Sequence, residues 1–168
     1  IHNLQAIVEH GGYLLLFLTT YIEGIPIVGQ FIPGHTIVLI SGFLAKLGVL
    51  KIYKVLIIVI VGATLGDVTG FLLGKKYGFN LLIKISSYFS IKKEYIERVR
   101  VLINENTIKT IILGRFSPIT RPLSPFIVGA SGIDAKKFWF FDILSVALWS
   151  SVSVAIGYVF GASYHTVS

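Results

Sequence analysis

Residues 21–39, YIEGIPIVGQFIPGHTIVL, decide how this chain can fold. A glutamate follows the apolar run of residues 12–22, and two prolines and a histidine come before the chain turns apolar again at residues 36–45. Each apolar segment holds roughly a dozen residues or fewer, whereas a spanning helix needs about 20. Short apolar segments around a polar break are typical of a re-entrant hairpin, which enters the bilayer and returns to the same face. We therefore expect a re-entrant helical hairpin at about residues 12–47.

The composition is that of an integral membrane protein. Of the 168 residues, 54% are hydrophobic and only 14% are charged, and the mean hydropathy is +0.82. A soluble domain carries about 25% charged residues, which leaves a soluble protein with a very large core as the weaker alternative. The net charge of +7 comes without a basic face interleaved with exposed aromatics, so no nucleic-acid partner is expected. The absence of cysteine excludes disulfides and thiolate metal sites, and the absence of methionine suggests a window of a longer protein.

Two segments are long and apolar enough to span a bilayer. Residues 55–74 carry one charge, Asp67, and residues 138–162 carry one charge, Asp142. Asp142 is near the start of its span, and we expect it at the membrane interface. Asp67 either packs helices together, bonded to a hydroxyl or a tryptophan, or has a function. A further pair of short apolar segments flanks a second proline-rich break and predicts a second re-entrant hairpin at about residues 107–132.

Residues 79–106 link the two halves of the chain. Apolar positions recur on one helical face here, which predicts amphipathic helices, either at the membrane surface or packed on the rest of the protein. Hairpins that return to their own face place residues 75–110 and 133–137 on one side of the membrane, together with most of the basic residues. The positive-inside rule assigns that side to the cytoplasm, so we expect a multi-pass protein of the cell membrane.

The two halves share a pattern that indicates an internal duplication. Glu23 is followed by prolines three and ten residues later, and so is Arg115. The two spans end as GFLLGKKY (70–77) and GYVFGASY (157–164). Only one full span lies between the hairpins, so the copies are expected to be inverted, as in many transporters. The residues expected to break the hairpins are Pro26, Pro33, Gly34, Pro118 and Pro125.

Glycines recur every four residues along the first span. A stripe of small residues lets another helix approach closely, so we assign these glycines a packing role. They are Gly62, Gly66, Gly70 and Gly74, followed by Gly78 at the end of the span.

The two-fold axis of an inverted repeat would bring Glu23 to face Arg115 or Arg121 where the hairpins meet. The alternative is a purely structural ion pair, which stabilises little because desolvation offsets the attraction. Two arginines near one carboxylate would leave surplus positive charge, and the guanidinium fork suits a phosphate, so a lipid phosphate or another anion is the expected guest. His35 is either a helix-cap or interfacial histidine or a proton-responsive site beside Glu23.

The residues assembled so far resemble the DedA family, also called the SNARE-associated Golgi protein or VTT-domain family. The resemblance covers nearly the whole chain, so we expect one membrane domain over residues 1–168, with repeats at about 12–78 and 107–162. The matching pieces are EGIP and PGH (23–35), GDVTGFLLGKKYG (66–78), GRFSPITRPLSP (114–125), GASG (129–132) and GYVFG (157–161).

The resemblance implies two facing re-entrant hairpins and a role in moving lipids across bilayers. Bacterial members are implicated in returning undecaprenyl phosphate or phosphatidylethanolamine across the cytoplasmic membrane, with dependence on the proton gradient, and eukaryotic relatives resemble phospholipid scramblases. The family's two acidic groups and two arginines fall at Glu23, position 35, Arg115 and Arg121. Here His35 stands where many members carry an acid, which changes the charge that this position can hold.

We therefore predict a flippase or scramblase for a phosphate-bearing lipid, whose partners are membrane lipids and protons and which uses no cofactor. Arg115 and Arg121 would bind the headgroup, Glu23 and His35 would exchange protons or gate access, and Asp67 would assist. One alternative is a lipid-phosphate phosphatase or phosphotransferase, although the sequence shows no nucleophile–base pair and no acidic cluster for magnesium. Another is a non-transporting scaffold, which accounts for the glycines but not for the paired charges.

Overall fold

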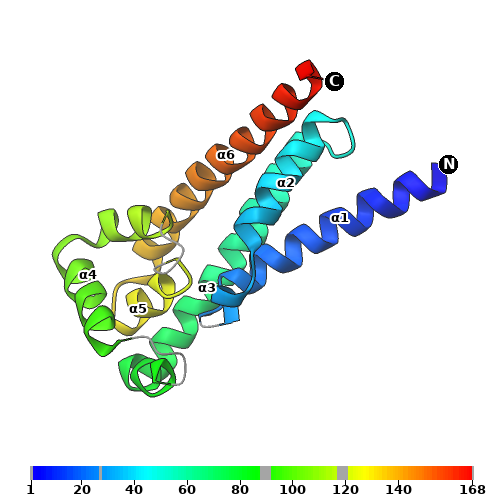
Figure 1. The fold of residues 1–168 in the computed structure, drawn as a ribbon. Coiled ribbons are helices and arrows are strands. Elements are labelled where there is room, and N and C mark those ends of the chain that lie inside the picture. Colours follow the sequence, from blue (N-terminus) through cyan, green and yellow to red (C-terminus); the bar gives the residue numbers. More distant parts are fainter. Residues whose placement is uncertain (1, 27, 88–91, 117–120, 168) are drawn as a thin grey trace.

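The computed structural model describes the chain apart from residues 1, 27, 88–91, 117–120 and 168, and the described residues form helices and turns (Figure 1). This confirms the predicted all-α class. The elements are α1 (His2–Glu23), a short 3-10 helix η1 (Val28–Phe31), α2 (Gly34–Lys46), α3 (Ile52–Ser86), α4 (Lys93–Gly114), α5 (Ser124–Ala130) and α6 (Ala135–Val167).

Two helices in the described part of the chain are long and apolar enough to cross a membrane. These stretches are Ile52–Leu81 in α3 and Ala135–Ser163 in α6. They contain the two predicted spans, 55–74 and 138–162. Their outer faces carry large apolar side chains that are more than half exposed, which suits a lipid solvent better than water. Examples on these helices are Ile57, Leu72, Leu144 and Phe160.

Helix α1 is longer than its apolar run. The apolar residues 12–22 form only its C-terminal half. The preceding turns are helical as well, but their polar residues hid them from a search for apolar segments. With 22 residues, α1 reaches about 33 Å, the thickness of a bilayer core. Helices α2 and α5 have 13 and 7 residues and are too short to cross.

Both predicted breaks interrupt the helices. Helix α1 ends at Glu23, and α2 begins at Gly34 directly after Pro33. In the second half α4 ends at Gly114, and α5 begins at Ser124 with Pro125 in its first turn, where a proline loses no helical hydrogen bond. Pro26 is buried in the first break, and Pro118 lies outside the described residues.

The linker is helical and packs on the second half. Beyond a kink at Gly78, whose φ of +67° suits glycine, α3 continues to Ser86, and α4 follows with a kink at Asn106. Ile96 of α4 is fully buried in an apolar cluster with Phe71 and Phe126. This contact fits the packing alternative for the linker, while binding of anionic lipid to its exposed basic side chains stays a prediction.

The glycine stripe of α3 lies against two other helices, α1 and α5. Along the first half of α3, added methyl groups at Gly62 and Gly66 would overlap with Thr20 and the Tyr21 carbonyl of α1. Gly70 lies at the carbonyl oxygen of Gly24, in the first break. Helix α3 therefore holds α1 and the first break at backbone contact distance.

Farther along α3 the neighbour is α5, and the contact is reciprocal. Gly74 of α3 lies against the Phe126 carbonyl of α5, and Gly129 of α5 lies against the Phe71 carbonyl of α3. On each helix the glycine comes three positions after the residue whose carbonyl contacts the other helix. Neither position has room for a Cβ, so the backbones of α3 and α5 are in direct contact.

The same arrangement joins α2 to α6. Gly157 of α6 lies against the Leu39 carbonyl of α2, and Gly42 of α2 lies against the Val154 carbonyl of α6. On each helix the glycine is again three positions after the carbonyl. The short helix after each break thus packs on the long helix of the other half. The duplication and the opposite membrane orientation of its copies stay predictions.

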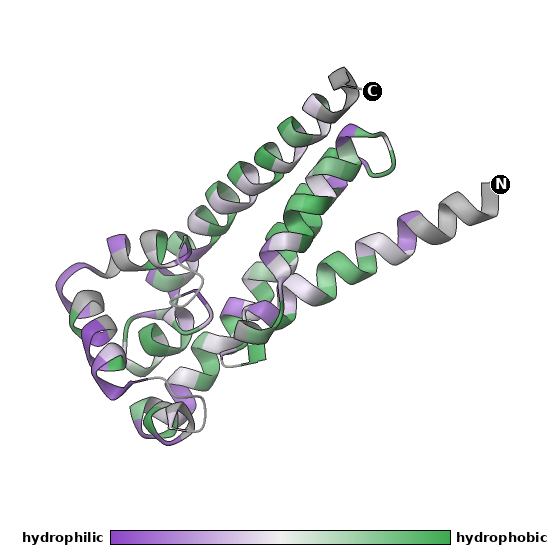
Figure 2. Ribbon diagram, viewed as in Figure 1, coloured by the Kyte–Doolittle hydropathy of each residue, from purple (hydrophilic) through white to green (hydrophobic). Residues whose placement is uncertain are grey.

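The termini and the α2–α3 turn lie toward one end of the molecule, and α4, α5 and the kinked end of α3 lie toward the other (Figure 1). Hydrophobic residues cover much of the long helices between these ends (Figure 2). Which of these ends faces the cytoplasm stays a prediction.

Gly74→Ala tests the reciprocal packing. Its methyl group would overlap with the Phe126 carbonyl, a backbone atom that cannot move aside alone, so we expect a loss of about 1–3 kcal/mol in the free energy of unfolding in detergent. Gly11→Ala is the matched control, because nothing lies within 4 Å of a Cβ there, and alanine favours a helix. Equal stability of both variants would contradict the packing described for α3 and α5.

Candidate functional site

Five charged side chains lie buried where the breaks meet the long helices, each at 7% exposed or less. The breaks supply one carboxylate and two guanidiniums, and α3 and α6 each supply one carboxylate. They are Glu23, Asp67, Arg115, Arg121 and Asp142.

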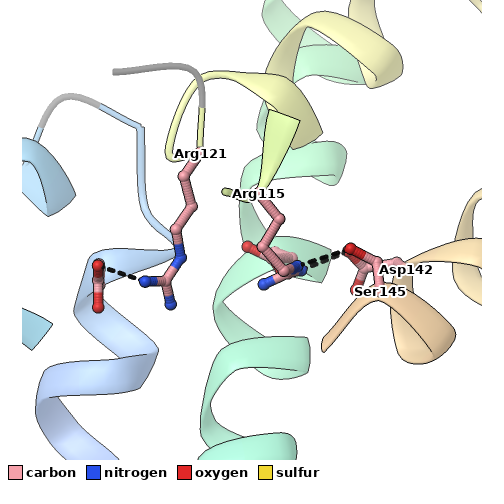
Figure 3. A network of polar contacts seen from close by, with 6 residues as sticks. Arg115, Arg121, Asp142 and Ser145 are labelled. Atoms are coloured by element: carbon pink, nitrogen blue, oxygen red, sulfur yellow. Dashed lines mark hydrogen bonds and ion pairs between the residues drawn. The ribbon is translucent and has the colours of Figure 1, made fainter. Parts of the chain in front are cut away.

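Arg121 pairs with Glu23 and so joins the two breaks. Its Nη1 donates to Glu23 Oε1 at 2.6 Å (Figure 3). The sequence predicted that Glu23 would face one of two arginines, and the structure places Arg121 there. The residues come from the C-terminus of α1 and from the turn before α5, so the ion pair links segments 98 positions apart.

Glycines of the first break fold the backbone around the Glu23 carboxylate. A Cβ at Gly34 would overlap with Glu23 Oε2, and a Cβ at Gly29 would overlap with the Glu23 carbonyl. Gly34 is therefore more than a helix breaker, since it leaves space for the carboxylate at the start of α2. Oε2 itself is buried and has no hydrogen-bond partner among the described residues.

Arg115 bridges α3 and α6. Its Nη2 donates to Asp67 of α3 and, at 2.8 Å, to Asp142 Oδ1 of α6, while its Nε donates to Ser145 Oγ at 3.0 Å. In Figure 3 Arg115 points toward Asp142 and Ser145, away from the pair that Arg121 makes. Asp67 thus bonds to a guanidinium, and neither a hydroxyl nor a tryptophan takes that place.

The interfacial position expected for Asp142 is wrong. The side chain is only 2% exposed, and it belongs to the buried network. The expectation took Phe138 as the start of the span, but α6 begins at Ala135, so Asp142 lies two turns inside the helix.

The expected surplus of positive charge is also wrong, because both Asp67 and Asp142 join the arginines. With Asp142 included, three carboxylates accompany two guanidiniums, so the formal charge of the five ionised groups is −1. Arg115 is already held by two carboxylates, whereas Arg121 has one. Arg121 is therefore the guanidinium more available to an anion.

A cavity of about 400 Å³ opens at the junction of the breaks. It brings together the four positions that the resemblance singled out, and Asp67 does not line it. Among the described residues its polar lining consists of Glu23, His35, Thr36, Arg115, Arg121 and Ser153, and its apolar lining includes Ile32, Phe116, Trp149, Val152 and Ile156. The two linings make the cavity amphipathic.

His35 lies on this cavity with its hydrogen bond directed to α6. Its Nε2 is 3.3 Å from Ser153 Oγ, and its ring centroid is 5.5 Å from that of Trp149. Glu23 lines the same cavity. The contact puts a hydroxyl beside an imidazole, a pair that sequence spacing could not reveal because 118 positions separate them.

Trp149 was missed by the sequence analysis. The Cζ atom of Arg121 lies 3.7 Å from the centroid of its ring, in cation–π geometry. Trp149, Val152, Ser153 and Ile156 all line the cavity from one face of α6. The available signal was a tryptophan in the middle of a span, far from the interfaces where this residue is usually enriched.

The arrangement can bind an anion through Arg121 and exchange protons through the carboxylate and the imidazole. Among the described residues no group of three or more histidine, cysteine, aspartate or glutamate side chains could hold a metal ion.

The family model of the VTT domain matches residues 32–159. Protein DedA of Escherichia coli K12 is 27% identical over 165 residues, which cover 96% of this chain and 75% of that protein. The membrane protein slr0232 of Synechocystis is 32% identical over 163 residues, covering 96% and 72%. Inner membrane protein YqjA of Escherichia coli K12 is 26% identical over 150 residues, covering 89% and 67%. No solved structure gives a significant match.

Arg115→Gln tests the bridge between α3 and α6. It leaves Asp67 and Asp142 buried without their cation, so we expect a loss of about 3–5 kcal/mol in the free energy of unfolding. Arg98→Gln, at an exposed position, is the control and should change stability little. Adding Asp67→Asn to Arg115→Gln should recover part of the loss. No difference between Arg115→Gln and Arg98→Gln would show that the bridge does not hold the helices.

Proposed function

This chain belongs to the DedA family of membrane proteins, and we propose that it moves a phosphate-bearing lipid across the bilayer with coupling to protons. The lipid is undecaprenyl phosphate or a phospholipid. The observation that carries the proposal is the amphipathic cavity in which Arg121 meets Glu23.

The cavity suits an amphiphile. Its volume of about 400 Å³ is within the range of small-molecule sites, and polar and apolar walls face the same space. A phosphate would bind at Arg121, and the first carbons of a lipid chain would lie against Ile32, Val152 and Ile156. Arg115 adds positive potential from the cavity wall while it stays bound to Asp67 and Asp142.

Competition for Arg121 provides the coupling. In the structure Glu23 occupies Nη1 of Arg121 at 2.6 Å, so a phosphate that uses this nitrogen displaces the carboxylate. A protonated Glu23 attracts the guanidinium less than a carboxylate does, because the charge–charge interaction is lost. Proton uptake by Glu23 therefore favours phosphate binding, and release of the proton favours release of the lipid. His35, on the same cavity, is placed to exchange that proton.

Re-entrant hairpins supply the path. Helices α2 and α5 reach about 20 Å and 10 Å, whereas the bilayer core is about 30 Å thick, so both end inside it. Non-helical backbone is tolerated at that depth because it is buried in protein or lines the cavity. Residues 75–110 and 133–137 face the cytoplasm in this arrangement.

One contact favours a second candidate, a lipid-phosphate phosphatase. Ser153 Oγ lies 3.3 Å from His35 Nε2, close to the distance of a nucleophile and its base, and Arg121 lines the same cavity. Among the described residues no second hydrogen-bond partner orients the imidazole. Transport remains the better proposal because it uses the Glu23–Arg121 pair as well.

Headgroup translocation in proteoliposomes tests the transport proposal. We expect Arg121→Ala to slow translocation at least tenfold, because the phosphate loses its guanidinium. Glu23→Gln should keep headgroup binding but lose the response to a pH gradient, since the titrating group is gone. Arg98→Ala, which removes an exposed arginine, should behave as wild type. Unchanged translocation in both cavity variants would overturn the site, and absence of translocation by wild type would favour a scaffold.

Phosphate release from the same lipids tests the second candidate. We expect none from the purified protein. Release that is abolished by Ser153→Ala, with folding unchanged, would make the chain an enzyme and displace the transport proposal.

A further inference from the structure

Trp149 contacts a cavity residue from each break. It is 3% exposed in the middle of α6. The Arg121 guanidinium, from the second break, lies over its ring at 3.7 Å, and the His35 ring, at the start of α2, lies 5.5 Å away at a tilt of 45°. One rigid aromatic side chain therefore fixes groups that the chain brings from both halves.

The guanidinium of Arg121 has two supports of different kinds. Glu23 holds one edge through Nη1, and Trp149 holds the face. A phosphate that displaces Glu23 takes over the edge and leaves the face untouched. The ring contact is thus the support that persists through the exchange on which the proposed function depends.

We propose that Trp149 is a positioning residue that holds the plane of the Arg121 guanidinium so that its donor edge faces the cavity. The planar guanidinium presents its N–H groups in a fixed fork, and a phosphate needs that fork in one orientation to bind both oxygens. Without the ring, Arg121 would regain the rotational freedom of a long side chain, and ordering it would oppose binding. The inference rests on the proposed function, because it assigns Trp149 a role in headgroup binding.

A purely structural role makes a different prediction. Trp149 also belongs to an apolar cluster with Leu16, Val38, Val55 and Val154. If packing were its whole role, an aromatic and an aliphatic replacement would differ in stability alone. If the ring supports Arg121 through a cation–π contact, the two replacements also differ in headgroup binding, because phenylalanine keeps a ring face for the guanidinium and leucine does not.

Calorimetric titration with dihexanoyl phosphatidic acid, a short-chain phosphate lipid, measures the difference. We expect Trp149→Leu to weaken binding about thirtyfold, the size of a desolvated cation–π contact, and Trp149→Phe to weaken it only a few-fold. Trp139→Leu is the control, because Trp139 lies half exposed outside the cavity. Thermal unfolding checks that each variant folds, and the comparison of phenylalanine with leucine holds even if both lose stability.

Fluorescence gives a second readout that packing alone would not move. The chain has two tryptophans, so Trp139→Phe leaves Trp149 as the sole emitter. Added phosphatidic acid should change its emission in that background, and Arg121→Ala should abolish the change. If the wild type binds phosphatidic acid and Trp149→Leu binds it with the same affinity, this inference is overturned and the proposed function is not. A wild-type protein that binds no phosphate lipid would overturn the proposed function and this inference with it.

Discussion

Mutual neutralisation of buried charges is the constraint on which the rest of the structure depends. Isolated ions buried in protein are expensive, so each guanidinium must lie against a carboxylate. Arg121 meets Glu23 and draws the two breaks together, and Arg115 meets Asp67 and Asp142 and draws α3 and α6 together. Helices that carry these groups cannot shift independently without separating charges in an apolar medium. The breaks therefore come to one place, and the cavity forms there.

Glycines make this approach possible. The short helices α2 and α5 lie against α6 and α3 through reciprocal contacts between glycines and carbonyls, and no side chain separates the backbones. The first break applies the same principle to a charged group, because Gly34 leaves room for the Glu23 carboxylate. Close backbone packing thus fixes the scaffold, and the charges fix how its parts are joined. A lipid phosphate would enter at the one contact in this network where an arginine has a single carboxylate partner.

Local sequence patterns predicted the fold well. The contacts within the site could be predicted only in part, because they join residues that are far apart in the sequence. Apolar length located α3 and α6, and prolines located both breaks, because these signals depend on neighbouring residues. The partner of Glu23 could be narrowed to two arginines but not chosen, since the choice depends on how α5 packs. Asp142 was misplaced because its helix starts before the apolar run. Trp149 was missed because its importance comes from Arg121 and His35, which approach it only in the folded chain.

The central claim is that a lipid phosphate replaces Glu23 at the guanidinium of Arg121. Solid-state NMR of the protein in bilayers can measure the dipolar coupling between the phosphorus of a bound phosphate lipid and isotopically labelled arginine side chains, with Arg121→Lys to assign the signal. We expect a strong coupling, from direct contact, that disappears in Arg121→Lys. A coupling that survives in Arg121→Lys, or bound lipid without coupling to any arginine, would contradict it.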